Sequence, residues 1–207
     1  FNSLNVTPSA NEAIKFNSSA NGFETGSAGG AMKFISKITA SSSSTISFTS
    51  GIDSTYKEYM FIFNNIHPAT NNQDIQFNAS VDGGSNYNVT KTSNTFQAQH
   101  DEADSETALQ YNTDRDLSQG TGAQRFSLQI GNGNDECVAG TLHLFNPSST
   151  TFVKHFMARV NGYNGSDYSQ DFFTAGYMNT TSAVDAIQFS FQSGNIDAGT
   201  ITLYGIN

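Results

Sequence analysis

Apolar and polar residues alternate along much of the chain after residue 31. In Asp74–Val81 every second side chain from Ile75 onward is apolar and those between are polar, which predicts a β-strand with one buried face. In Lys57–Asn64 the residues from Tyr59 to Phe63 are apolar at every position, so we expect that strand to be covered on both faces. We expect these two strands to form the centre of an antiparallel β-sandwich.

The same pattern predicts further strands, separated by segments rich in Gly, Ser and Asn. They are expected at Met32–Thr39, Ser44–Thr49, Tyr87–Lys91 with Thr95–His100 as one interrupted strand, Arg125–Ile130, Thr141–Phe145, Thr151–Val160, Asp171–Met178, Ile187–Gln192 and Thr200–Ile206. About nine or ten strands at regular spacing favour an all-β fold. The predicted fold class is an antiparallel, jelly-roll-like β-sandwich with a short extended N-terminal segment.

Two polar stretches interrupt the strand pattern and are predicted to be loops. Residues 101–121 are polar and acidic with little periodicity, and Asn161–Ser169 carries two tyrosines among polar residues. Long loops are uncommon in compact domains and are often functional, so both are candidates for ligand binding.

Residues 1–31 differ from the rest of the chain. Short apolar groups there are separated by Ser, Asn, Pro and Gly, and they offer too little apolar surface for a separate core. The segment is therefore expected to pack on the main domain, to be disordered, or to pair with other copies of itself. Because the chain begins at Phe1 and not at Met, we expect a piece of a longer protein or a processed product.

Composition and charge exclude several kinds of partner. Charged residues make up 13% of the chain, and the formal net charge is −9 with a pI near 4.6. A nucleic acid needs a basic stripe, and anionic lipid repels an acidic chain, so we expect neither as a partner. No apolar run approaches the length of a membrane span, so no membrane insertion is expected. Cys137 is the only cysteine, which excludes an intrachain disulfide.

One group of residues has side chains suited to metal binding. It consists of His100, Asp101, Glu102, Asp104 and Glu106. Carboxylates at short spacing can bind Ca²⁺, and a nearby His can bind a transition metal. The group lacks the glycine-centred spacing of an EF-hand, however, and a solvated acidic loop has the same composition. We therefore predict no metal and no cofactor.

Catalysis would need a recognisable reactive arrangement. Loop carboxylates such as Asp101, Glu102 and Asp114 could meet as a glycoside-hydrolysing pair, but spacing in sequence does not place them together. Cys137 lacks a neighbouring His pattern that would activate its thiol. We predict that the chain is not an enzyme.

Tyrosines in polar loops are the strongest candidates for recognition. A flat ring beside Asn and Asp suits stacking on a sugar and hydrogen bonding to its hydroxyls; the alternative is that each ring packs against a strand end. The predicted ligand-binding residues are Asp82, Asn86, Tyr87, His100, Asp101, Glu102, Tyr111, Tyr163, Asp167 and Tyr168.

Several segments resemble virion proteins of marine bacteriophages, which are often attached to tail-fibre genes. The segments are Met32–Lys37, Phe48–Tyr56, Asn65–Thr70, Asp82–Tyr87, Leu144–Thr150 and Gly194–Ile206. Residues 4–25 are similar to the end of a phage fibre stalk. The chain has neither a His-x-His needle nor a chaperone-cleavage motif, which other fibre tips carry.

The resemblance implies a distal tail-fibre domain that recognises the host surface within the virion. Residues 1–31 would be the stalk and trimerisation segment and linker, and residues 32–207 the sandwich tip. The implied partners are two further copies in a homotrimer, the rest of the fibre and virion, and a bacterial surface glycan or outer-membrane protein. The alternatives are a capsid decoration or head-fibre protein and a fibre-borne polysaccharide depolymerase.

Overall fold

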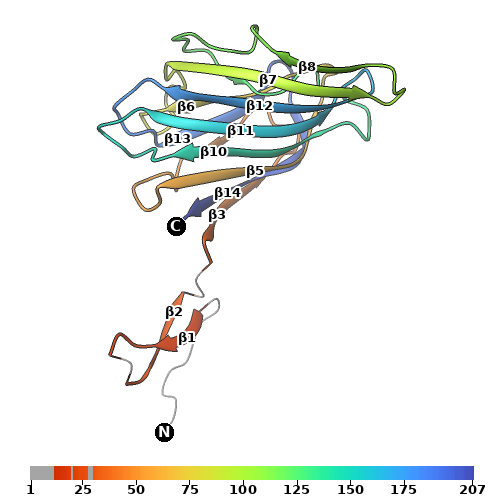
Figure 1. The fold of residues 1–207 in the computed structure, drawn as a ribbon. Helices are drawn as coiled ribbons and strands as arrows, with labels where there is room; N and C mark the ends of the chain where they lie inside the picture. The colour runs from red at the N-terminus through yellow and green to blue at the C-terminus, as the bar shows by residue number, and fades with distance from the viewer. Residues whose placement is uncertain (1–11, 20, 28–29) are drawn as a thin grey trace.

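The computed structural model describes residues 12–19, 21–27 and 30–207. These residues form β-strands joined by turns, with no helix, and so include no helix that could cross a membrane (Figure 1). The strands are β1 (Glu12–Phe16), β2 (Phe23–Ser27), β3 (Met32–Thr39), β4 (Ile46–Phe48), β5 (Glu58–Pro68), β6 (Ile75–Ser80), β7 (Lys91–Asp101), β8 (Thr107–Tyr111), β9 (Gln124–Arg125), β10 (Val138–Phe145), β11 (Lys154–Tyr163), β12 (Tyr168–Met178), β13 (Ala186–Phe191) and β14 (Ile196–Ile206).

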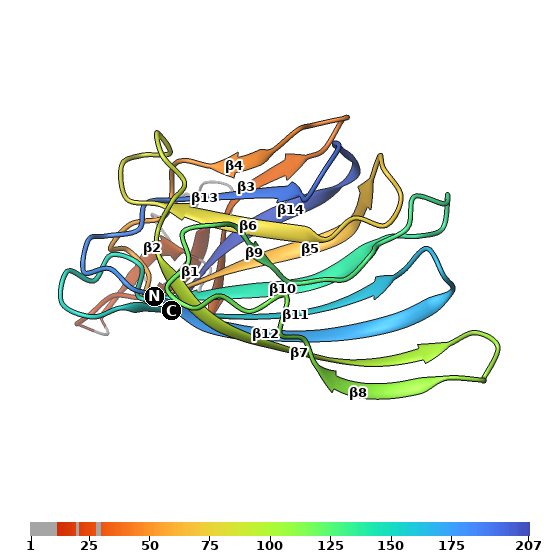
Figure 2. The same ribbon diagram turned by 90° about the horizontal axis from the view of Figure 1, so that it is seen from above.

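Two antiparallel sheets stack as a sandwich, which confirms the predicted fold class at that level. The larger sheet has eight strands in the order β3-β14-β5-β10-β11-β12-β7-β8, and the smaller has four in the order β4-β13-β6-β9. Figure 1 shows the larger sheet in front of β6 and β13 of the smaller one, and Figure 2 shows the same layers from above. The strands β5 and β6, expected at the centre, lie in opposite sheets.

Phenylalanine rings join the two sheets. Phe61 and Phe63 on β5 pack against Phe189 on β13, with ring centroids 5.1 and 5.2 Å apart. Phe77 on β6 meets Phe156 on β11 at 5.1 Å. All five rings are buried, and burial of such apolar area is the main favourable term in folding.

Strand β11 shows how the sequence produces one buried and one exposed face. Its side chains alternate between buried and exposed along the strand. Phe156, Ala158 and Val160 point into the sandwich, so Met157 and Arg159 point away from it, because successive side chains of a strand lie on opposite faces. We call the solvent side of the eight-stranded sheet the outer face.

The two ends of the large sheet have different roles. The described sandwich begins near Met32, which pairs with Ile206 beside the C-terminus; we call this the proximal end. The opposite, distal end carries the β7–β8 turn and the β11–β12 turn, since Tyr168 pairs with Asp101 there. With 11 residues in β7, about 35 Å separates the two ends.

The N-terminal part forms a small separate sheet where an extended segment was expected. β1 and β2 pair as an antiparallel hairpin, with Phe16 opposite Phe23 and their rings stacked at 4.8 Å. Figure 1 places this hairpin beyond the start of β3, outside the sandwich. The expectations for residues 1–11, 20, 28 and 29 lie outside the described residues.

Several element predictions were wrong in their bounds. Lys91 begins β7, so residues 87–90 are not a strand, and β8 occupies part of the loop expected at 101–121. β11 continues to Tyr163 and β12 begins at Tyr168, which shortens the second expected loop to a tight turn. Of the strand expected at Arg125–Ile130, only Arg125 lies in a strand, β9. The backbone pairing stops there because the Ile75 N–H donates to the Ser127 hydroxyl and not to a backbone carbonyl.

Candidate functional site

Two turns far apart in the sequence meet at the distal end of the sandwich. We call residues 100–106 and 163–168 the distal turns. The Glu102 N–H donates to the carbonyl of Asp167 over 3.0 Å, beside the register pair Asp101 and Tyr168. Six predicted site residues therefore come together: His100, Asp101, Glu102, Tyr163, Asp167 and Tyr168.

Local hydrogen bonds shape each turn. The Asp101 carboxylate accepts bonds from the Ser105 hydroxyl and N–H and from the Glu106 N–H, and the Ser105 bond contributes most to lowering the pKa of Asp101. In the other turn, Asn164 Oδ1 accepts from the N–H groups of Ser166 and Tyr168. Side-chain caps of this kind replace backbone partners in tight turns. The hydrogen bonds of the Asp101 carboxylate therefore stabilise its own turn.

Carboxylates orient the two tyrosines of the site. Tyr168 Oη donates to Glu106 Oε2 over 2.8 Å, and this hydrogen bond raises the pKa of Tyr168. Tyr163 Oη donates to Asp167 Oδ1 over 3.2 Å, and a hydrogen bond to Glu102 is the main cause that raises the pKa of Tyr163. Both phenols remain protonated at neutral pH and are held in place as rigid aromatic groups.

A shallow groove of about 290 Å³ lies between the distal turns. Its lining residues are His100, Asp101, Glu102, Asn161, Gly162, Tyr163 and Ser169. His100 Nε2 lies 3.1 Å from Asp104 Oδ1, and Asn161 Nδ2 donates to the Ser169 hydroxyl. The groove thus combines an aromatic ring with amide, hydroxyl and carboxylate groups, which suits a ligand rich in hydroxyl groups.

The remaining predicted residues lie elsewhere. Asp82, Asn86 and Tyr87 follow β6 and precede β7, so they lie toward the proximal end. Asn86 donates to both carboxylate oxygens of Asp82 and, as the main cause, lowers the pKa of Asp82 to about 2. The buried Tyr87 hydroxyl lies against Gly84, as expected if the ring packs against the fold. Tyr111 is on β8, where its hydroxyl donates to Asp116.

The acids considered for catalysis have separate structural partners. Asp101 holds its turn, and Asp114 pairs with Arg115 at 2.6 Å on the segment after β8. Among the described residues, no three His, Cys, Asp or Glu side chains gather as a potential metal site.

Sequence reasoning missed a second depression at the distal end. Its volume is about 490 Å³, and its lining is Asn65, His67, Asn134, Asp135, Glu136, Cys137, Asp197 and Ala198. His67 Nε2 lies 3.0 Å from the Gly133 carbonyl oxygen, and its Nδ1 lies 3.5 Å from Asp197. Burial raises the pKa of the Cys137 thiol, which disfavours the reactive thiolate. No local motif marks this depression, because three separate segments form it.

Comparison with known families and curated proteins identifies no relative of this chain. The chain matches no model of a known protein family, and the search of curated proteins also finds no match.

Proposed function

We propose that this chain is the distal, receptor-binding part of a bacteriophage tail fibre. It binds a bacterial surface glycan or outer-membrane protein without catalysis, as a homotrimer within the virion. Residues 1–31 serve as the stalk and trimerisation segment, and residues 32–207 as the tip. Adsorption is reversible, and weak single sites gain strength from multivalency.

The observation that carries this proposal is the separation of the distal turns from the chain's point of attachment. The sandwich is joined to the N-terminal hairpin near Met32, at the proximal end (Figure 1). The groove with Tyr163 and Asn161 lies at the far end of the strands. A domain fixed by its N-terminal side would therefore direct this groove outward, toward a surface that the particle meets.

The chemistry of the groove favours a hydroxylated ligand. Rings fixed by hydrogen bonds lose little conformational entropy when they bind. The surrounding carboxylates and the net charge of −9 disfavour anionic ligands. A neutral glycan meets both conditions, since its hydroxyl groups can bond Glu102 and Asn161 while its apolar ring face contacts Tyr163.

Binding of the purified chain to bacterial cells and to a glycan array tests the proposal. We expect the wild-type chain to bind a defined set of strains. The double variant Tyr163→Ala with Tyr168→Ala should bind at least about tenfold more weakly, because multivalency amplifies the loss at each site. The control Phe152→Ala removes an exposed ring outside the groove and should bind as wild type does.

Four outcomes would count against the proposal. The wild-type chain could fold normally yet bind no strain, or the double variant could bind with wild-type strength. Antibody labelling of intact particles provides the third, since labels on the head would favour a capsid decoration protein. Release of reducing ends from host polysaccharide would instead establish a depolymerase.

A further inference from the structure

Large apolar side chains gather on the outer face of the eight-stranded sheet. Strand register aligns one row of side chains across seven neighbouring strands. The row consists of Phe34, Tyr204, Met60, His143, Met157, Ala175 and Asn94. The neighbouring row runs through Lys37, Thr202, Ile62, Thr141, Arg159, Phe173, Phe96 and Tyr111. Apolar side chains thus extend across the strands from β3 to β8.

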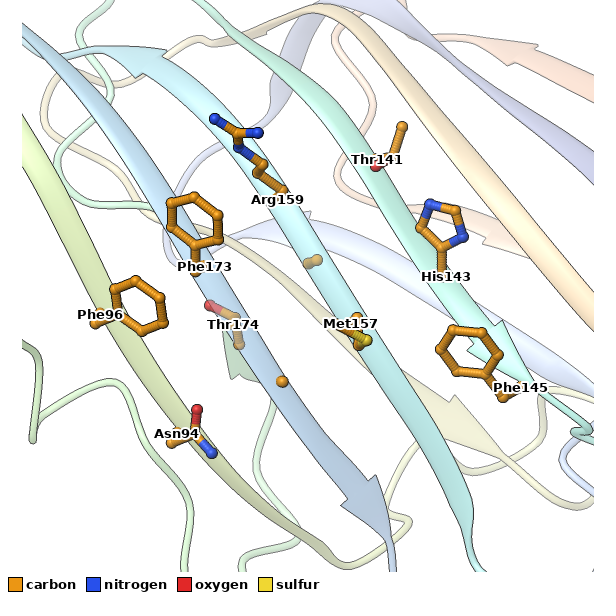
Figure 3. Close-up of a pocket in the computed structure, with 11 residues that line it drawn as sticks. Asn94, Phe96, Thr141, His143, Phe145, Met157, Arg159, Phe173 and Thr174 are labelled. Carbon is orange, nitrogen blue, oxygen red and sulfur yellow. The ribbon is translucent and has the colours of Figure 1, made fainter.

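The centre of this face is a shallow depression of about 610 Å³ (Figure 3). Figure 3 shows the rings of Phe96, Phe173 and Phe145 lying flat along the sheet, with Met157 between them. The Phe96 and Phe173 rings are 4.8 Å apart and nearly parallel, at 3°. Arg159 Cζ lies 4.7 Å from the centroid of Phe173. Aromatic residues, Met and Arg are the types enriched at protein–protein interfaces.

The charged side chains near the depression, Arg159 and Glu58, each have a polar partner there. Arg159 binds the Asp171 carboxylate through two nitrogens, the shorter contact being 2.7 Å. His143 Nδ1 lies 2.6 Å from Glu58 Oε1. The whole chain carries −9, so two copies repel one another over most of their surface. This nearly neutral face is where like-charged copies can approach at the lowest electrostatic cost.

The exposed apolar area is close to what a stable contact between proteins requires. Six large side chains on this face are between 40% and 77% exposed: Met32, Phe34, Phe96, Leu109, Tyr111 and Met157. At roughly 200 Å² for each full side chain, they present on the order of 700 Å². A standard interface buries about 800 Å² on each partner, so these side chains together supply most of the area that one partner contributes.

We propose that the outer face of the eight-stranded sheet is the surface through which copies of this chain associate. The inference rests on the self-association in the proposed function and names its surface, centred on Met157 and reaching Phe34. The exposed rings of Phe16 and Phe23 on the N-terminal hairpin, which precedes β3, extend the apolar surface beyond the sheet. A two-stranded hairpin is at best marginally stable by itself, and association of copies would cover both apolar regions.

The test measures the mass of the full chain in solution as a function of concentration, by light scattering after size exclusion. Wild type should exceed the single-chain mass of 22.3 kDa. The double variant Phe34→Glu with Met157→Glu buries two charges in the proposed contact and should raise the dissociation constant at least about tenfold. The control Phe152→Glu places the same charge at a side chain that is 69% exposed outside this face and should keep the wild-type mass.

Methionine oxidation by dilute peroxide provides a second measurement on the unmodified chain. Met157 and Met32 are exposed in one copy, whereas Met60 and Met178 are buried. Association through this face should slow oxidation of Met157 and Met32 as concentration rises and leave the two buried methionines unchanged. Equal oxidation rates of Met157 at all concentrations, in a sample that associates, would overturn the proposal.

The outcomes separate this inference from the proposed function. If wild type associates and the folded double variant keeps its mass, the interface lies elsewhere and only this inference fails. If wild type stays at 22.3 kDa, both this inference and the homotrimer fail, whereas cell binding still tests adsorption. If the double variant loses cell binding with its mass unchanged, the face binds the receptor and not a second copy. Association without cell binding would contradict the receptor function alone.

Discussion

Tyr168 on β12 donates a hydrogen bond from its hydroxyl to the Glu106 carboxylate over 2.8 Å. This bond joins two turns that are separated by about sixty residues of sequence, and it lies beside the backbone bond from Glu102 to Asp167. The distal turns therefore behave as one unit, whose shape depends on both segments.

Removal of the Tyr168 hydroxyl should loosen this unit without unfolding the sandwich. In Tyr168→Phe, we expect amide hydrogen exchange at residues 102–106 to become faster, because one of the contacts between the turns is lost. The midpoint of urea unfolding should hardly change, since the bond is at the surface. Tyr177→Phe is the matched control on the same strand, because within the described residues the Tyr177 hydroxyl makes no hydrogen bond. Unchanged exchange in Tyr168→Phe would mean that the backbone contacts alone hold the turns.

Lys91 should make stability depend on alkaline pH. Its ammonium group is buried and donates to Asn78 Oδ1 and to the Val89 carbonyl, and burial lowers the pKa of Lys91 to about 8. Below pH 8 both folded and unfolded chains hold the proton, and the full cost of burying the charge is present. Above pH 8 the folded chain loses the proton first, so stability rises toward pH 10.5 by about 1 kcal/mol per pH unit.

A comparison with Lys91→Met isolates this effect. Urea unfolding of both proteins between pH 7 and 10.5 should give a difference in unfolding free energy that is constant below pH 8. Above pH 8, the unfolding free energy of wild type should rise relative to that of the variant. Parallel curves over the whole range would show that Lys91 has an ordinary pKa in the folded chain.

Asp74 holds a buried group of charges before β6. Its carboxylate binds Arg115 at 3.0 Å and Arg125 at 3.3 Å, and both Asp74 and Arg115 are buried. Asp74→Ala should lower the free energy of unfolding by about 3–5 kcal/mol, because it leaves a buried guanidinium without this partner. The control Asp197→Ala removes an exposed carboxylate beside His67 and should cost under about 1 kcal/mol. If urea titrations gave equal losses of unfolding free energy for Asp74→Ala and Asp197→Ala, burial would not explain the effect of Asp74.

Gly199 should tolerate no side chain. Its φ is +107°, and an added Cβ would lie 2.3 Å from the Asn65 carbonyl oxygen, where β14 bulges against β5. Gly199→Ala should therefore lower the unfolding free energy by at least about 2 kcal/mol. At Gly122 an added Cβ would meet no atom within 4 Å, so Gly122→Ala should be nearly neutral. A wild-type melting temperature for Gly199→Ala would show that the bulge can rearrange.

Most of the strands were predictable because the side-chain period of a strand is local. The alternation in Asp74–Val81 correctly placed Ile75, Phe77 and Ala79 in the core. It was wrong about the other face, because Asn78 and Ser80 are buried as well and Val81 is exposed. The Asn78 amide donates to the carbonyls of Tyr87 and Thr121, so loop segments cover that face of β6.

The pattern led to a wrong prediction at Tyr59–Phe63. Apolar residues at every position there suggested that a layer covers both faces of the strand. The inner face of β5 meets the smaller sheet, whereas Ile62 on the outer face is only half-buried and no second layer covers it within the described chain.

The candidate site was predictable only in part. Polar loops with tyrosines pointed to Tyr163 and Tyr168, and both lie in the distal turns. The groups around Asp82 and Tyr111 looked similar in sequence but lie away from those turns. The depression around His67 had no signal, because a bulge in β14 and the loop before β10 bring its residues together.

The sequence by itself determined that this protein is built from antiparallel strands with a phenylalanine core, since period-two alternation and turn residues act over a few positions. Only the tertiary structure decided that β5 and β6 face each other from opposite sheets, that the turns at Glu106 and Tyr168 meet, and that Met157 lies on an open face. Those relationships depend on the order of strands across a sheet and on what covers each face, and neither quantity is encoded in the spacing of neighbouring residues.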